Sequence, residues 1–218
     1  MDLNSLVLFS ALVSLVGVGA SLYIGLSLYR IGSTIMDKGL VLSSVAMFIF
    51  GFTLLIEVIV NLTAPMHTSR PGHRPQEILS LLVNRGTVTA IPLYTLSYAF
   101  MAVSHYVSGV SLEGFNVLKR EFVVIPIFLL VFIDYNIIDL FVLIIATILV
   151  LGRYGSTRLP TAIFYTILGM SHLMVVVLLV EKTSWWIVPV STLLRGSAPI
   201  ILYVSSFNRE LGTRGSRL

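Results

Sequence analysis

Long apolar runs constrain this chain more than any other feature of its sequence. A helix needs about 20 consecutive apolar residues to cross the hydrocarbon core of a bilayer. Seven apolar segments stand out, at residues 5–28, 39–63, 76–107, 122–134, 137–151, 160–180 and 185–206. We therefore predict an all-α fold: a polytopic integral membrane protein with seven transmembrane helices in a lipid bilayer.

The fourth and fifth segments are short, and joined together they would form one long helix in a six-span protein. Asp134 and Asp139 lie where the two segments meet. Carboxylates are costly at the middle of a bilayer and much less so at its surface. This pattern favours two spans connected by a hairpin at the membrane interface.

The composition leaves no room for a separate soluble domain. Hydrophobic residues make up 56% of the 218 residues and charged residues 11%, whereas a soluble domain is typically about 25% charged. We expect a single transmembrane domain over residues 1–218. It comprises helices one to three (about 5–107), a linker helix (about 122–134), helices five to seven (about 137–206) and a basic cytoplasmic tail (207–218).

Basic residues between the apolar segments indicate the orientation of the chain. With the N-terminus outside and the C-terminus in the cytoplasm, the inner regions hold Arg30, Lys38, Lys119, Arg120, Arg153, Arg158, Arg209, Arg214 and Arg217. The outer regions hold only Arg70, Arg74 and Lys182. Cytoplasmic loops carry an excess of Lys and Arg, so we predict this orientation, as a multi-pass protein of the plasma membrane.

The charge and cysteine content exclude several classes of protein. The net charge of +4 comes from short loops and not from a basic stripe, so we expect no nucleic-acid partner. The sequence has no cysteine, which excludes disulfides and thiolate metal sites. It also fits a thermophilic host, because thermophiles use fewer labile residues.

The two ends of the chain resemble each other. Arg30-Ile-Gly-Ser-Thr34 follows the first predicted helix, and Arg153-Tyr-Gly-Ser-Thr157 follows the fifth. Glu57 and Glu181 come 27 and 28 residues after these arginines, and Arg85-Gly-Thr and Arg195-Gly-Ser come next. This order predicts a 3+1+3 parallel repeat, although small polar turns and Leu-rich helix ends also recur without duplication.

A 3+1+3 plan resembles the layout of SWEET-type sugar transporters. An odd linker helix gives both halves the same orientation, as in parallel-repeat transporters. The resemblance concerns the layout alone, because SWEET proteins carry a proline motif in the first helix of each half. The corresponding segments here, 5–28 and 137–151, contain no proline.

Ionisable residues inside predicted spans are the candidate ligand-binding residues, because such groups are expensive in a membrane. Arg85 and Arg195 each lie roughly 15 Å below the outer face, at about 1.5 Å rise per residue. Glu57 and His172 fall in the same outer half, and Tyr94 could add a hydroxyl. We predict an outward-facing charged cavity in which the arginines meet an anion. The alternative is a set of buried ion pairs, with Glu57–Arg85 foremost.

Prolines interrupt the two helices that carry the arginines. Pro92 and Pro199 follow Arg85 and Arg195 in the matching halves. Because proline removes a backbone hydrogen bond and bends a helix, we predict hinges at both positions. A static kink would produce the same pattern.

The sequence offers no recognisable cofactor site. Every lysine lies at a helix end or in a loop, which argues against a retinal Schiff base. His105 and His172 lie at different depths, which argues against bis-histidine haem. We expect no metal, no cofactor and no catalytic residues, and we favour a non-enzymatic role.

Three functions remain open. The first is a small transporter or permease for a small anionic or polar solute. The second is a seven-helix sensor or receptor that signals through a cytoplasmic partner. The third is a non-catalytic subunit of a membrane complex or a homo-oligomer, in which the buried polar residues serve assembly.

Overall fold

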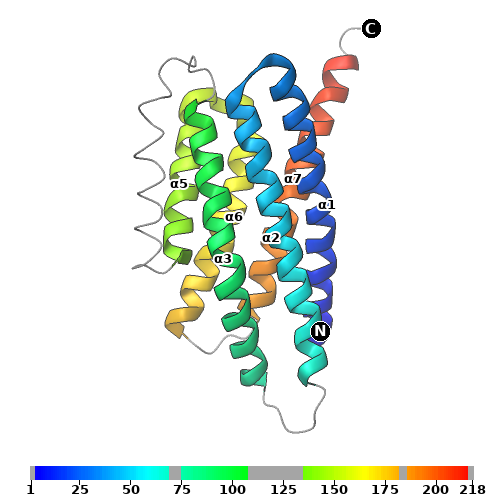
Figure 1. Ribbon diagram of the computed structural model, residues 1–218, viewed down its shortest axis with the longest axis vertical. Coiled ribbons are helices and arrows are strands. Elements are labelled where there is room, and N and C mark those ends of the chain that lie inside the picture. The colour runs from blue at the N-terminus through cyan, green and yellow to red at the C-terminus, as the bar shows by residue number, and fades with distance from the viewer. Residues whose placement is uncertain (1–2, 69–74, 108–134, 182–185, 216–218) are drawn as a thin grey trace.

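The computed structural model describes residues 3–68, 75–107, 135–181 and 186–215 (Figure 1). Side chains are described for residues 5–63, 90–107, 136–155, 158–178 and 186–206. The described chain is all-helical. It contains α1 (Leu3–Ile35), α2 (Lys38–Thr68), α3 (Pro75–Val107), α5 (Tyr135–Tyr154), the 3-10 helix η2 (Gly155–Arg158), α6 (Leu159–Glu181) and α7 (Ile187–Gly215).

Five of these helices are long and apolar enough to cross a membrane: α1, α2, α5, α6 and α7. Their outer faces carry large exposed apolar side chains, such as Leu12, Phe52 and Ile148 at 59–64% exposure. Such faces suit a lipid environment, where apolar exposure carries no penalty. The chain is therefore built as a membrane protein. The predicted linker helix at 122–134 lies outside the described residues.

The six described α-helices form a closed bundle in chain order. Helix α1 packs on α2, α2 on α3, α3 on α5, α5 on α6 and α6 on α7. Helix α7 packs in turn on α1 and closes the ring. Figure 1 shows α1, α3, α5 and α7 running upward while α2 and α6 run downward. The helices that flank residues 108–134 are thus parallel. The start of the first helix and the end of the last helix therefore lie at opposite ends of the bundle.

Local signals explain the turn between α1 and α2. Asp37 Oδ1 accepts hydrogen bonds from the backbone N–H groups of Gly39 at 2.8 Å and Leu40 at 3.2 Å, which caps the start of α2. Met36 adopts a positive φ of 55° between the two helices. Gly155, also at φ 55°, plays the same part after α5, where glycine adopts this conformation without strain.

Several predicted boundaries need correction. Residues 30–34, predicted as a turn, continue α1, and Ser33 and Thr34 donate to the Arg30 carbonyl at 3.0 and 2.7 Å. The segment 207–218, predicted as a separate tail, continues α7 as far as Gly215. The helix α3 begins at Pro75, in keeping with the preference of proline for the first turn of a helix.

Small side chains bring α1 and α7 into close contact. Ser14 and Gly17 of α1 face Gly196 of α7, and an added Cβ at either glycine would collide with the opposite backbone. The Ser14 hydroxyl also donates to the Thr192 carbonyl at 3.4 Å. Such small-residue contacts are typical of membrane helix packing. This contact positions the middle of α7, where the candidate site lies.

Candidate functional site

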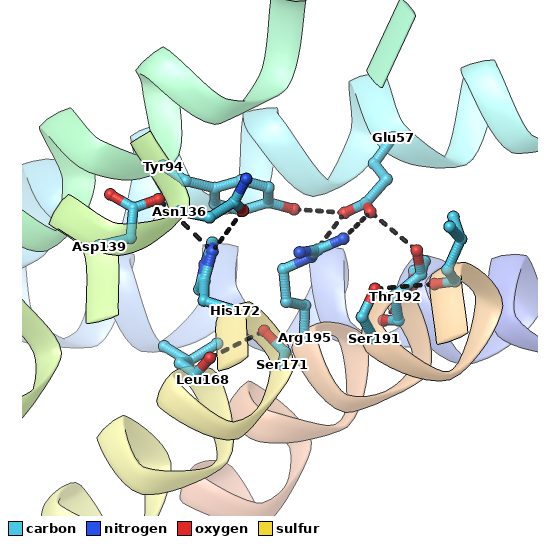
Figure 2. Close-up of polar contacts among 12 residues, drawn as sticks. Glu57, Tyr94, Asn136, Asp139, Leu168, Ser171, His172, Ser191, Thr192 and Arg195 are labelled. Atoms are coloured by element: carbon cyan, nitrogen blue, oxygen red, sulfur yellow. Dashed lines mark hydrogen bonds and ion pairs between the residues drawn. The ribbon is translucent and has the colours of Figure 1, made fainter. Parts of the chain in front are cut away.

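Glu57, on the inner face of α2, is the centre of a buried polar cluster (Figure 2). Its Oε1 accepts hydrogen bonds from Arg195 Nη2 at 2.5 Å and Thr192 Oγ1 at 2.8 Å. Its Oε2 accepts from the Tyr94 hydroxyl at 2.7 Å and from Arg195 Nε at 3.3 Å. One carboxylate thus joins α2, α3 and α7 and has both oxygens fully engaged.

Arg195 lies on the buried face of α7, one residue before the tight contact at Gly196. Its guanidinium holds Glu57 through two nitrogens and lies 5.5 Å from the centre of the Tyr94 ring. Arg195 and Glu57 are each 6% exposed. Because a lone buried charge costs several kcal/mol or more, each residue makes the burial of the other tolerable.

His172 on α6 is the centre of a second cluster. Its Nε2 lies 3.1 Å from the Tyr98 hydroxyl, and its Nδ1 lies 3.1 Å from Asn136 Oδ1. Asp139 Oδ2 is 3.6 Å from the same Nδ1, and both His172 and Asp139 are fully buried. This cluster joins α3, α5 and α6.

Two tyrosines one turn apart on α3 connect the clusters. The rings of Tyr94 and Tyr98 stack with their centres 5.9 Å apart. Tyr94 bonds to Glu57, Tyr98 contacts His172, and the Tyr94 and His172 rings meet edge to face at 6.3 Å. A continuous buried polar layer therefore crosses the bundle from α7 and α2 to α5.

The structure brings together four of the predicted ligand-binding residues: Glu57, Tyr94, His172 and Arg195. The side chain of the fifth, Arg85, lies outside the described residues. So does the side chain of Glu181, which the predicted repeat matches to Glu57. The sequence predicts Glu57–Arg85 as the foremost buried ion pair. In the structure Arg195 of α7 pairs with Glu57, and a part for Arg85 stays a prediction.

The predicted open cavity is not the arrangement around these residues. Tyr94 is 1% exposed and His172 0%, and their polar atoms contact one another. The described structure is therefore a closed arrangement of this layer. The outward-facing cavity stays a prediction.

The predicted hinge prolines lie inside helices that contribute to the layer. Pro92 is in α3, two residues before Tyr94, and Pro199 is in α7, four residues after Arg195. Their hinge role stays a prediction.

Sequence reasoning missed Asp139, Asn136 and Thr192 as members of the layer. Asp139 was placed in an interfacial hairpin, yet it is fully buried one turn inside α5. A usable signal was its spacing from Asn136, because residues three apart share a helix face. No group of three or more metal-ligating side chains occurs among the described residues.

Comparison with known protein families, with curated proteins and with solved structures finds no match to this chain. The function has to be argued from the geometry of the polar layer.

Proposed function

We propose that this protein is a small membrane transporter whose solute site is centred on Arg195. The observation that carries the proposal is that two guanidinium nitrogens of Arg195 donate hydrogen bonds to the carboxylate of Glu57 inside the bundle. A carboxylate or phosphate group of a solute offers the same pair of oxygens. Glu57 thus occupies the position that a small anionic solute would take after displacing it.

The helices around the site support a change of conformation. Arg195 and Tyr94 lie on α7 and α3, close to Pro199 and Pro92. Proline leaves a carbonyl without its helical partner, so bending there breaks fewer hydrogen bonds than elsewhere. We propose that bends at these prolines open the buried layer outward and admit the solute.

We also propose the complete topology: seven spans, with the N-terminus outside and the C-terminus in the cytoplasm of the plasma membrane. The support is that α3 and α5 run in the same direction. Arg153, late in α5, donates to the carbonyl of His105, late in α3, at 2.7 Å. Because these ends lie together, α5 begins at the end of the bundle opposite to the end of α3. The 27 residues between 107 and 135 suffice for the one further span that we propose.

The parallel repeat is part of the same proposal. Exchanging α1, α2 and α3 with α5, α6 and α7 leaves the pattern of neighbouring helices unchanged, since the α3–α5 contact becomes the α7–α1 contact. Both halves run up, down and up in Figure 1. This pattern supports a pseudo-twofold axis along the membrane normal, with the linker segment completing a 3+1+3 plan.

Labelling of single cysteines checks the topology, because the natural chain has none. In spheroplasts, we expect Trp186→Cys to react with a membrane-impermeant maleimide added outside. Met36→Cys and Arg158→Cys should react only after permeabilisation. All three positions are exposed, so failure to label reflects sidedness. Labelling of all three from outside would contradict the proposed orientation.

Anion rescue checks the solute site. Glu57→Gln leaves Arg195 buried without its counter-charge, so the variant should melt at a lower temperature than the wild type. A small anion that accepts hydrogen bonds from the Arg195 guanidinium should restore stability. At an anion concentration 100 times the dissociation constant, the gain is about 2.7 kcal/mol. We would measure melting temperatures of the purified protein with acetate, lactate, phosphate and nitrate at constant ionic strength.

The rescue experiment has a matched control and a clear negative result. Arg195→Lys, added to Glu57→Gln, keeps the positive charge but loses the planar pair of guanidinium donors. It should therefore abolish the preference for carboxylate or phosphate over nitrate. Arg30→Lys, at an exposed position, should behave as the wild type. If no anion stabilises Glu57→Gln, the Arg195–Glu57 pair serves only to hold the helices together. A non-catalytic membrane subunit would then be favoured, because both Glu57 oxygens are already satisfied within the protein.

A further inference from the structure

Two kinds of hydrogen-bond donor surround the carboxylate of Glu57, and the proposed solute site needs only one of them. Arg195 donates to both oxygens through Nε and Nη2, and these are the groups that a solute anion would take. The hydroxyls of Tyr94 and Thr192 donate to the same two oxygens at 2.7 and 2.8 Å. Displacement by a solute therefore removes the positive partner of Glu57 and leaves two neutral partners within reach.

The charge balance at Glu57 changes when an anion takes its place beside Arg195. In the closed structure Arg195 and Glu57 balance each other, and each is 6% exposed. An anion on Arg195 uses that positive charge, so an ionised Glu57 would become a buried charge without a counter-charge, which is strongly unfavourable. Charges elsewhere in the polar layer are the same before and after the exchange, so this comparison does not depend on them.

Among the described side chains, Arg195 is the one cation that faces Glu57. Helix α2 packs on α1, α3 and α7. Helix α3 presents Tyr94 to Glu57, with Tyr98 one turn further on, and residues 5–22 of α1 contain no ionisable side chain. A proton from water is therefore the positive charge that can replace Arg195 at Glu57.

The hydroxyls of Tyr94 and Thr192 suit both protonation states of Glu57. A hydroxyl donates to an ionised carboxylate, and after rotating it accepts a hydrogen bond from a protonated one. A guanidinium only donates, so Arg195 has no such second role towards a carboxylic acid. A protonated Glu57 can therefore stay between Tyr94 and Thr192 while Arg195 binds the solute.

We propose that Glu57 takes up one proton when a solute anion displaces it from Arg195, and releases that proton when the ion pair forms again. The proton comes from bulk water, forms an O–H bond at one carboxylate oxygen and returns to water. One proton then accompanies each monovalent anion, and the loaded site carries the same charge as the empty one. This coupling rests on the proposed transport function.

The pH dependence of anion affinity tests the coupling in the purified full-length chain. We would titrate the wild type and Glu57→Gln with acetate, lactate and nitrate, whose charge is constant between about pH 6 and 8, and follow the melting temperature. Uptake of one proton per anion makes the dissociation constant of the wild type rise about tenfold per pH unit. Glu57→Gln has no carboxylate to protonate, so its dissociation constant should not depend on pH. Asp37→Asn, a change at a helix cap where Asn and Asp are equivalent, should keep the wild-type slope.

Infrared difference spectra show where the proton binds. Adding the anion to the wild type should produce a protonated-carboxyl band that is absent from Glu57→Gln and retained in Asp37→Asn. If Glu57→Gln binds the anion and the wild-type affinity is independent of pH, the coupling fails while the solute site stands. Proton-dependent binding without that band would place the proton on another group, such as His172, and overturn the assignment to Glu57. If no anion binds either protein at any pH, the solute site fails and the coupling fails with it.

Discussion

Replacing Arg195 by methionine is expected to destabilise the protein by about 3–5 kcal/mol, the usual cost of removing one partner of a buried ion pair. Methionine fills much of the space of the arginine stem and leaves Glu57 charged in a closed apolar bundle. Glu57 is 6% exposed and would keep only Tyr94 and Thr192 as donors. Denaturant unfolding of the purified protein in mixed micelles measures the loss.

The double variant Arg195→Met with Glu57→Gln separates charge from packing. Glutamine keeps a side-chain oxygen for the Tyr94 and Thr192 hydroxyls and carries no charge, so most of the loss should be recovered. Arg30→Met, at an exposed site, should change stability by no more than about 0.5 kcal/mol. A double variant as unstable as Arg195→Met alone would mean that the arginine acts through its packing.

The pairing of Arg195 with Glu57 shows where sequence reasoning stopped. Rise per residue placed both residues in the outer half of the membrane, and they do lie at one level. That Arg195 reaches Glu57 depends on how α7 approaches α2 and α3 at that height. Lengths and depths of single helices carry no information about lateral neighbours.

Asp139 shows a second limit. A carboxylate near the end of an apolar run is usually at the interface, so local sequence favoured a hairpin there. Asp139 is fully buried, and a ring nitrogen of His172, 33 positions away on the next helix, lies 3.6 Å from it. The all-helical architecture and the apolar spans were predictable because each depends on local composition and length. The polar layer was predictable only in part because it depends on contacts between helices.

The small residues of α1 show a third limit, because a sequence does not tell which helix a small-residue face contacts. Ser14 and Gly17 lie three apart and share a helix face. The structure adds that this face meets α7 at Gly196, next to Arg195. The close approach of two backbones therefore sets the position of the candidate solute site, and stability and site geometry should change together when it is disturbed.

Substituting leucine for Gly196 should accordingly destabilise the protein by about 3 kcal/mol, the upper end for overpacking a close contact. Its Cβ would lie 2.7 Å from the Ser14 Cα and 2.9 Å from the Ser14 backbone nitrogen. Since backbone atoms cannot rotate away, α7 has to move off α1 and carry Arg195 with it. Gly19→Leu is the matched control, because a Cβ there meets nothing within 4 Å. Unfolding midpoints measure the loss of stability, and anion rescue in the Glu57→Gln background measures the displacement of Arg195. Equal stability of the two leucine variants would show that the α1–α7 contact is looser than described.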